Sequence, residues 1–240
     1  MTVLELERIT RVYGSGHLRV AAVNDVSLRV RAGEFVAVMG PSGSGKSTLL
    51  RLAGGLDRPS SGRVLLSGRD LASLDEDGLA TARRREVGFV FQEANLLPSL
   101  TAAENVALAL ELDGVRPRVA MTGARDLLDW LGLAELGTVF PAQLSGGEQQ
   151  RVAIARAVAG GRSLLLADEP TGALDAITGE SVMSLLGQRC AAGCAVVLVT
   201  HNVRHAARAD RVLFLNDGRL TGEAVPPAGP EYLLGTEQAR

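Results

Sequence analysis

The chain has 240 residues, enough for one large domain, and its 46% hydrophobic and 22% charged residues are ordinary for a globular protein. Its net charge of −2 lacks the basic excess of a nucleic-acid-binding protein, so we expect no nucleic-acid partner. No apolar run approaches the ~18–20 residues that a membrane-spanning helix needs, and charged residues stand where a signal peptide would be apolar. We therefore expect a cytosolic chain that only a partner could hold at a membrane.

The first predicted elements are strands. Residues 1–35 combine short alternating segments with turns, and Val20–Val30 is predicted to be a strand broken at Asn24-Asp25. The apolar run Phe35–Met39 follows, which is typical of a strand buried on both faces of a parallel sheet. Similar runs recur at residues 87–91, 164–167, 195–200 and 212–215. Because helical patterns separate these runs, the sequence predicts an α/β fold with a central parallel sheet.

A glycine-rich segment directly after the Phe35–Met39 run matches the phosphate-loop pattern G-x-x-x-x-G-K-[ST]. Its residues are Gly40, Pro41, Ser42, Gly43, Ser44, Gly45, Lys46 and Ser47, and a helix continues through Thr48. Backbone N–H groups and the helix N-terminus would surround phosphate oxygens. Lys46 would lie between the β- and γ-phosphates, and the Ser47 hydroxyl would bind Mg²⁺. The loop indicates nucleotide binding, but kinases, GTPases and motor ATPases share it.

The middle of the chain, from about residue 93 to residue 160, carries helical periodicity and no convincing strand. A capping box of Thr101 and Glu104 opens its first helix. Helices are predicted over residues 101–112, 125–131 and 147–159. We interpret this segment as a helical insertion in the α/β core.

A few other reactive or charged side chains carry no predicted chemistry. The acidic run Asp75–Asp77 and the basic run Arg83–Arg85 are interpreted as one solvated, salt-bridged helix face. Cys190 and Cys194 are expected to be reduced and buried, because no further ligand lies near them in sequence. His17 and His205 are expected to be solvated.

Two carboxylates end a predicted apolar strand at residues 163–167. Asp168 is suited to hold Mg²⁺ through water, and Glu169 is suited to polarise an attacking water. Beside a phosphate loop, these acids indicate a site that binds and hydrolyses a nucleotide rather than two incidental surface charges.

A pair of glycines opens the last predicted helix of the middle segment, within Leu144–Arg151. Ser145 and Glu148 form an S-x-x-E capping box, which by itself explains both residues. The box does not require Gly146 or Gly147, whose free N–H groups at a helix N-terminus would offer a second anion site. From the residues alone, a helix cap and a phosphate site both remain open.

Taken together, these segments resemble the ATP-binding cassette (ABC) ATPase family over roughly residues 3–222. The matches beyond the phosphate loop are the Q-loop Gln92, the signature Leu144–Glu148, the pair Asp168-Glu169, the D-loop Ala173–Asp175, the switch histidine His201 and the adenine-stacking aromatic Tyr13. The resemblance implies a P-loop NTPase (RecA-like) parallel-sheet core, an N-terminal antiparallel β subdomain and an inserted α-helical subdomain at about 93–160. The domain would span 1–222, followed by a loop and a short helix near 231–234 in a tail, 223–240.

The resemblance also assigns roles. Gln92 would join Ser47 and Asp168 around Mg²⁺, and His201 would bond the γ-phosphate of ATP and hold the water near Glu169. Tyr13 would stack on adenine, although it could equally be a half-buried strand aromatic.

The resemblance further implies a head-to-tail dimer, either a homodimer or a pair with a related ATPase. Ser145, Gly146, Gly147 and Glu148 of one chain would close over ATP on the other chain, with Asp175 at the dimer contact. ATP would then hold the dimer closed, and hydrolysis would release it.

Several phrases, such as residues 52–59 and 100–106, resemble the lipoprotein-releasing and macrolide-export branch of bacterial cassettes. The branch implies a peripheral subunit at the cytoplasmic face of the inner membrane that drives export through a separate permease. Mechanical signalling to a membrane partner without transport is the alternative. Leu96 and Leu97, apolar residues in a loop, would either contact that partner or pack on the chain's own helices.

Overall fold

The computed structural model describes residues 1–226, apart from the side chain of His17. The helix expected near residues 231–234 and the solvation expected of His17 lie outside the described residues.

Within residues 1–226 the strands form two sheets. The first is antiparallel, with four strands in the order β2-β1-β4-β5. The second has six strands in the order β10-β9-β3-β8-β7-β6, all parallel except the edge strand β10. The strands are β1 (Thr2–Tyr13), β2 (Val20–Arg31), β3 (Phe35–Met39), β4 (Ser61–Leu66), β5 (Arg69–Asp70), β6 (Val87–Val90), β7 (Leu164–Asp168), β8 (Ala195–Val199), β9 (Arg211–Asn216) and β10 (Arg219–Ala224).

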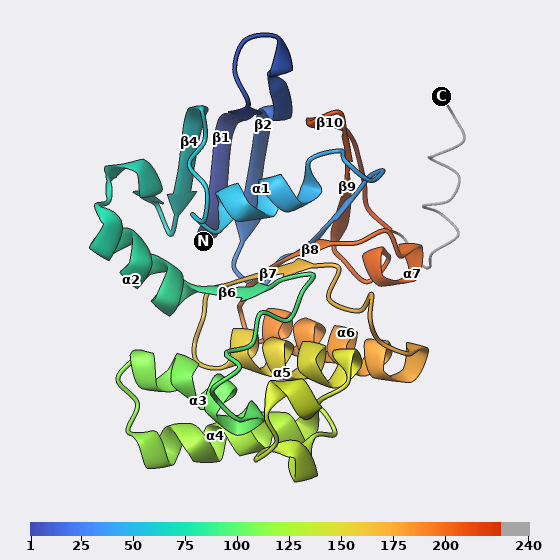
Figure 1. The fold of residues 1–240 in the computed structure, drawn as a ribbon. Coiled ribbons are helices and arrows are strands. Elements are labelled where there is room, and N and C mark those ends of the chain that lie inside the picture. Colours follow the sequence, from blue (N-terminus) through green and yellow to red (C-terminus); the bar gives the residue numbers. More distant parts are fainter. Residues whose placement is uncertain (227–240) are drawn as a thin grey trace.

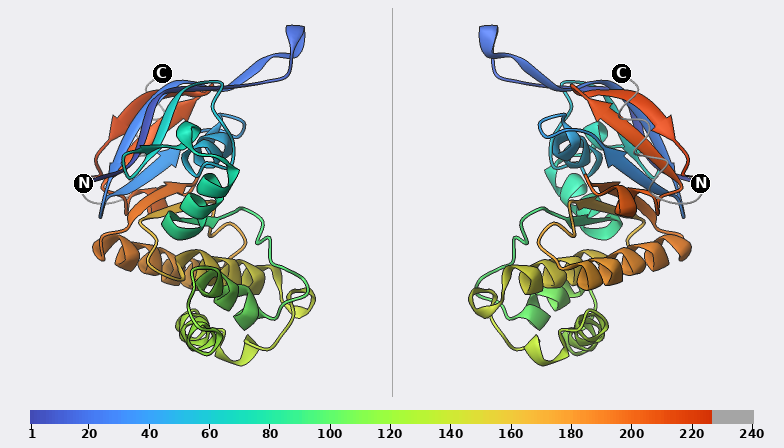
Figure 2. Two further views of the ribbon diagram at one scale, coloured as in Figure 1. Left: turned by 90° about the vertical axis from the view of Figure 1, so that its left-hand side faces the viewer. Right: turned by 90° about the vertical axis from the view of Figure 1, so that its right-hand side faces the viewer.

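Helices cover both faces of the parallel sheet (Figure 1). Helix α1 lies between the two sheets, α5 and α6 cover the opposite face, and α3 and α4 lie beyond α5 (Figures 1 and 2). The helices are α1 (Lys46–Ala53), α2 (Glu76–Glu86), α3 (Ala102–Leu112), α4 (Pro117–Trp130), α5 (Gly146–Val158), α6 (Ala176–Ala191) and α7 (Val203–Ala206). The fold is therefore layered, with the parallel sheet in the middle.

The alternation of side chains along each strand divides the core in two. In β3, Val36 and Val38 pack with α1 and the antiparallel sheet, whereas Phe35, Ala37 and Met39 pack with α5 and α6. All five side chains are buried. A strand with two covered faces needs apolar residues at every position, which is the pattern that predicts it.

The predicted helical segment is helical in the structure. The capping box is present, because the Glu104 carboxylate accepts a 2.8 Å bond from the Thr101 N–H and the Glu104 N–H donates to Thr101 Oγ1 at 3.4 Å. Helix α5 also begins within a residue of its prediction. The second helix was predicted too short: α4 begins at Pro117, eight residues before Arg125, because proline is well suited to a helix start.

Other local predictions were partly wrong. Strand β2 runs through Asn24-Asp25 without a break, and the irregularity appears instead as a bulge with Asp25 at φ 55°. Helix α2 carries both charged runs, but its arginines bond elsewhere. Arg83 donates to the Gly55 carbonyl at 3.0 Å, and Arg84 pairs with Asp113 at 3.7 Å.

The cysteine prediction is confirmed. Cys190 and Cys194 are free and buried, and burial raises the pKa of each thiol to about 11. The prediction for His205 is wrong, because this side chain is only 8% exposed and contacts Thr171.

Candidate functional site

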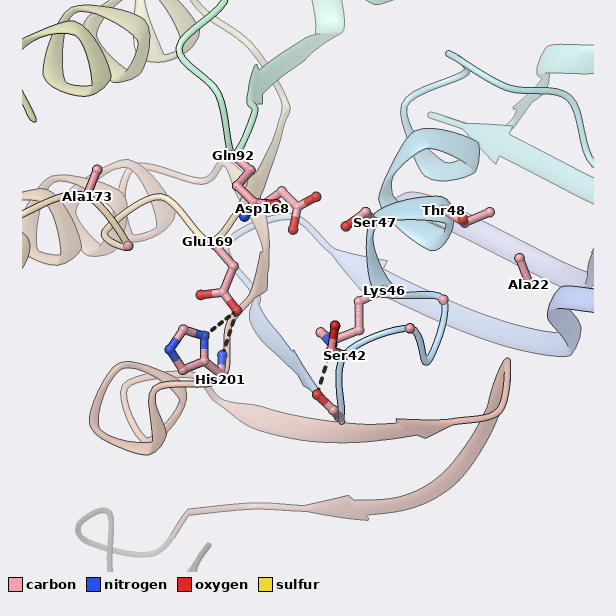
Figure 3. A pocket seen from close by; sticks show the side chains of 14 residues that line it. Ala22, Ser42, Lys46, Ser47, Thr48, Gln92, Asp168, Glu169, Ala173 and His201 are labelled. Carbon is pink, nitrogen blue, oxygen red and sulfur yellow. Dashed lines mark hydrogen bonds and ion pairs between the residues drawn. The ribbon is translucent and has the colours of Figure 1, made fainter. Parts of the chain in front are cut away.

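The site lies where four neighbouring parallel strands end. Gly40 follows β3, Gln92 follows β6 by one residue, Asp168 ends β7, and His201 follows β8 by one residue. Parallel strands present their carboxyl ends at one edge, where α/β proteins bind ligands. A cavity of about 710 Å³ opens at this edge (Figure 3). Its lining residues are Ala22, Gly40, Ser42, Gly43, Gly45, Lys46, Ser47, Thr48, Gln92, Asp168, Glu169, Gly172, Ala173 and His201.

The glycines of the phosphate loop are required by close backbone contacts. Gly45 has φ 100°, and a Cβ there would lie 1.9 Å from the carbonyl oxygen of Ala22. A Cβ on Gly40 would lie 2.0 Å from the carbonyl oxygen of Leu215. No larger residue fits either position, so glycine is required at both if the loop is to take this path at the start of α1.

The cavity is polar and partly desolvated. The Lys46 ammonium donates to the carbonyls of Gly40 at 2.9 Å and Pro41 at 2.7 Å. Burial lowers the pKa of Lys46, although Glu169 and Asp168 oppose that shift. Deep in the loop, Ser44 Oγ is buried and has no hydrogen-bond partner within the described chain. A partly buried cation and an unpaired hydroxyl donor fit an anionic ligand such as a phosphate.

Three oxygen-bearing side chains meet at one wall of the cavity: Ser47, Gln92 and Asp168 (Figure 3). Burial raises the pKa of Asp168, which is 8% exposed, whereas a hydrogen bond from Ser47 acts in the opposite direction. No cluster of three His, Cys, Asp or Glu residues suited to a metal occurs in residues 1–226. The donor set is therefore hydroxyl, amide and a single carboxylate, all hard oxygen ligands.

The second carboxylate, Glu169, is paired with His201. Its Oε1 accepts bonds from the His201 backbone N–H at 2.9 Å and from ring Nδ1 at 2.8 Å, and Thr200 Oγ1 donates to Oε2 at 3.3 Å (Figure 3). Glu169 has φ 46°, a left-handed conformation that is unusual for this residue. The His201 side chain is 78% exposed, whereas that of Glu169 is 16% exposed. The ring can therefore turn away while the carboxylate stays.

Some predicted site residues do not line this cavity. Tyr13 lies outside it: the hydroxyl donates to Asp57 at 3.0 Å, and the Arg11 guanidinium lies 4.7 Å from the ring centroid. Pro41 and Ser44 belong to the loop but not to its lining residues.

The signature residues also lie outside the cavity of their own chain. Their capping box is present, because the Ser145 N–H donates to Glu148 at 2.8 Å and the Glu148 N–H donates to Ser145 Oγ at 3.3 Å. The capping box does not require glycine at position 146, since a Cβ there would meet no atom within 4 Å. A Cβ on Gly147 would lie 3.3 Å from the Ala173 carbonyl oxygen.

Asp175 caps α6 through the N–H groups of residues 177 and 178, and the Thr178 bonds lower its pKa.

The loop that carries Gln92 is tied to helix α5. Gln150, a buried side chain, donates to the Phe91 carbonyl at 3.0 Å. Arg156 donates to the carbonyls of Ala94 at 2.9 Å and Asn95 at 2.8 Å, and burial lowers the pKa of its guanidinium. Three polar bonds thus join this loop to the helix that begins with the signature, two of them partly buried.

Three residues at the site were not predicted: Ala22, Gly172 and Thr200. Ala173, predicted as part of the D-loop, also lines the cavity. Ala22 offers no chemical signal in the sequence, since its backbone carbonyl oxygen is the group that lies against Gly45. Thr200 could have been found from its place at the end of β8, one residue before His201.

A parallel sheet with a phosphate loop after β3 and a buried aspartate at the end of β7 defines the P-loop class of α/β nucleotide-binding proteins. Comparison with known proteins gives the family. The model of the ABC transporter family matches residues 23–172. The macrolide export ATP-binding/permease protein MacB of Salmonella choleraesuis is 48% identical over 226 residues, and that of Hyphomonas neptunium is 46% identical over 235 residues. These matches cover 94% and 96% of this chain but only 35% and 36% of the relatives, so the chain spans about a third of their length.

Solved structures agree with the sequence relatives. The dimeric ATP-binding cassette MJ0796, described as a bacterial ABC transporter cassette, superposes with a TM-score of 0.90 at 42% identity. Its post-hydrolysis state, bound to ADP and Pi, superposes with a TM-score of 0.89 at 41% identity. Each match covers 94% of this chain and 99% of the other.

The chain belongs to the ABC transporter family, as its ATP-binding and ATP-hydrolysing cassette. The predicted fold class and the resemblance to macrolide-export cassettes are confirmed. No helix in the described range is long and apolar enough to cross a membrane.

Proposed function

We propose that the chain binds Mg-ATP in the cavity at the end of β3, with the γ-phosphate turned toward Glu169 and His201. The observation that carries this proposal is the convergence of the phosphate loop, Lys46, Asp168 and the Glu169–His201 pair on one cavity. Lys46 would leave its two loop carbonyls for the phosphates, which are stronger, charged acceptors. Tyr13, with Arg11 against its ring, would stack on the adenine after a small movement of its strand end.

We propose Mg²⁺ as the metal, held by Ser47, Gln92 and Asp168. Mg²⁺ prefers one or two carboxylates, neutral oxygens, water and substrate phosphates, which is the donor set at this wall of the cavity. When bound, the ion would neutralise charge on the β- and γ-phosphates. The raised pKa of Asp168 reflects burial of its charge, which a cation or Lys46 would offset.

Glu169 acts as the general base in this proposal. Its carboxylate would orient the attacking water and accept a proton from it, within reach of the γ-phosphate. His201 holds the carboxylate in the ligand-free geometry and would turn to donate to the γ-phosphate when ATP is bound. The exposure of the ring leaves it free to make this change.

The complete site requires a second cassette. Ser145, Gly146, Gly147 and Glu148 lie outside their own chain's cavity, and the helix N-terminus they form is suited to phosphate oxygens. The solved cassette MJ0796 is dimeric. In the proposed dimer these residues would close over ATP bound to the other chain, and Asp175 would lie at the contact.

The dimer would drive export through a separate permease at the cytoplasmic face of the inner membrane. The relatives that support this are fused ATP-binding/permease proteins for macrolide export, of which this chain spans about a third. The cassette domain would comprise residues 1–222, with the helical subdomain at about 93–160 and a tail at 223–240. Mechanical signalling without transport remains the second candidate, because the same cassette geometry would serve both.

Substitution of the proposed base tests the enzymatic part. Glu169→Gln should keep ATP binding and lower Mg-dependent hydrolysis by at least about 100-fold, since general-base catalysis contributes about 10²–10⁴-fold. Steady-state phosphate release and nucleotide binding would be measured side by side. A variant that hydrolyses ATP at the rate of the unsubstituted chain would overturn the assignment of Glu169.

A further inference from the structure

His205 is a buried histidine that the proposed chemistry does not use. It lies on α7, four residues after His201, and is 8% exposed. Its ring Nδ1 lies 3.0 Å from Thr171 Oγ1, and its Nε2 lies 3.9 Å from a carboxylate oxygen of Glu180 on α6. The ring is therefore enclosed between α7, α6 and the loop after β7.

The contact is a hydrogen bond between the Thr171 hydroxyl and a ring nitrogen of His205. Burial lowers the pKa of His205, against the opposite effect of Glu180. The hydroxyl can donate to Nδ1 or accept from it, and the tautomer of the ring sets the direction. In either direction the bond is partly buried and joins the same two side chains.

Thr171 occupies the middle of the loop that begins with Glu169. The Gly172 N–H donates to the Glu169 carbonyl at 3.1 Å, and the Leu174 N–H donates to the Thr171 carbonyl at 3.1 Å. Glu169 itself is held in a left-handed conformation by a bond from its N–H to the Val199 carbonyl at 2.9 Å. The position of Thr171 therefore constrains the unusual backbone that aims the Glu169 carboxylate.

Two side-chain bridges thus join the loop after β7 to the segment after β8. The outer bridge, Glu169 to His201, is exposed on the histidine side and would break when His201 turns toward phosphate. The inner bridge, Thr171 to His205, is partly buried, and neither residue lines the cavity. Only this inner bridge would remain formed while Glu169 activates water.

We propose that His205, acting through Thr171, is a positioning residue that holds Glu169 in its catalytic geometry after His201 has moved. This inference rests on the proposed role of Glu169 as the base. His205 does not touch ATP, so its loss should affect the chemical step and leave ATP binding largely intact.

Paired substitutions test the bridge. His205→Leu and Thr171→Val each remove the hydrogen bond between these residues and put an apolar side chain of similar bulk in place of the polar one. Each should lower kcat for ATP hydrolysis roughly five- to tenfold, with KM for ATP changed less than about twofold, as expected for one misplaced hydrogen bond. The double variant should be no slower than the worse single variant, because both substitutions remove one interaction.

Rescue and control variants separate positioning from general damage. His205→Asn places an amide oxygen where Nδ1 lies, and Thr171→Ser keeps the hydroxyl, so both should recover most of kcat. Arg204→Ala, at an exposed position on the same helix, should behave as the unsubstituted chain. Thermal unfolding and protein-concentration dependence would be recorded for every variant.

The outcomes distinguish this inference from the proposed function. The positioning role would be overturned if His205→Leu kept full kcat or if its KM rose in parallel. It would also be overturned if the effects were additive in the double variant, or if His205→Asn failed to restore kcat. An effect that disappears at higher protein concentration would assign the bridge to dimer contact and would also overturn it. Full activity in Glu169→Gln would instead overturn the proposed base, and this inference with it.

Discussion

Lys46 and Asp168 show how burial works on single side chains at this site. Desolvation lowers the pKa of the lysine and raises that of the aspartate, and each charge partly offsets the shift of the other. Lys46 is also the only lysine among the 240 residues. The chain thus places its one primary side-chain amine at the mouth of the phosphate loop, which makes that amine open to selective chemistry.

An amine-reactive acylating reagent should therefore label Lys46 and the α-amino group of Met1, and few other sites. Mg-ATP should slow labelling of Lys46 by at least about tenfold, because charge-assisted bonds to phosphate are worth roughly 1.5–3 kcal/mol. Labelling of Met1, which is 88% exposed, should not change and serves as the internal control. Peptide mass spectrometry reads both sites, and equal rates at Lys46 with and without nucleotide would contradict the phosphate-loop assignment.

His205 gives a pH dependence of stability. Its pKa in the folded chain lies below its ordinary value of 6.5, so the unfolded chain binds more protons once the pH falls under about 6.5. The charged groups around it are Glu180 and Arg208, with Glu169 and His201 further along. The stability advantage of His205 over Asn at this position should be full above pH 7 and shrink as the pH falls toward 5. Urea unfolding of both variants measures it, and an advantage that grows on acidification would be inconsistent with a buried neutral ring.

At the scale of elements, the buried apolar strands could be predicted from the sequence, and the exposed ones could not. Strands β3, β7 and β8 are continuous apolar runs because both faces are covered. Strands β4 and β10 alternate poorly and carry Gly, Arg and Ser or Thr, since they lie at exposed positions of their sheets. Their pairing depends on long-range neighbours that no local pattern reveals.

The site residues that could be predicted are those that follow buried apolar strands. Gly40–Ser47, Asp168, Glu169 and His201 could be placed because each stands directly after a predicted strand. Ala22 could not, because its part is a carbonyl oxygen that closes on Gly45 from a distant strand. His205 was mistaken for a solvated residue because its partner, Thr171, comes from another element.

The loop between β6 and α3 carries Leu96 and Leu97, which we expected either to contact a membrane partner or to pack on the chain's own helices. Leu96 packs on the core, whereas Leu97 is 43% exposed. Leu96 therefore follows the packing alternative, whereas contact of Leu97 with a membrane partner stays a prediction. The loop's bonds to Gln150 and Arg156 would carry a displacement at Leu97 to α5 and its signature end.

Leu97→Glu should accordingly abolish association with the membrane partner and leave the ATPase activity of the isolated chain within about twofold, because exposed substitutions rarely disturb folding. Leu18→Glu, another exposed leucine at 82%, is the matched control and should keep the association. Association would be measured by co-purification with membranes from cells that hold the partner. Retained association in Leu97→Glu would place the docking surface elsewhere.

At the scale of the whole molecule, the signature residues are not among those that line the cavity. The cavity lies at the carboxyl edge of the parallel sheet, and the signature opens α5, which covers one face of that sheet. One chain supplies a phosphate loop, the proposed base and a histidine to the cavity, whereas Gly146 and its neighbours in the signature do not line it. In the proposed head-to-tail dimer, a second chain would complete both halves of the site.

In the proposed mechanism, ATP closes two cassettes and hydrolysis through Glu169 opens them. The molar mass in solution of Glu169→Gln with Mg-ATP, measured by light scattering on a gel-filtration column, tests this mechanism. We expect a dimer with ATP, a monomer with ADP, and a monomer with ATP in the double variant Glu169→Gln, Gly146→Trp. A Cβ at Gly146 would meet no atom within 4 Å, so we expect the tryptophan to be tolerated by the fold and to obstruct ATP bound to the other chain. A monomer with saturating ATP, or a dimer that the tryptophan leaves intact, would contradict the mechanism.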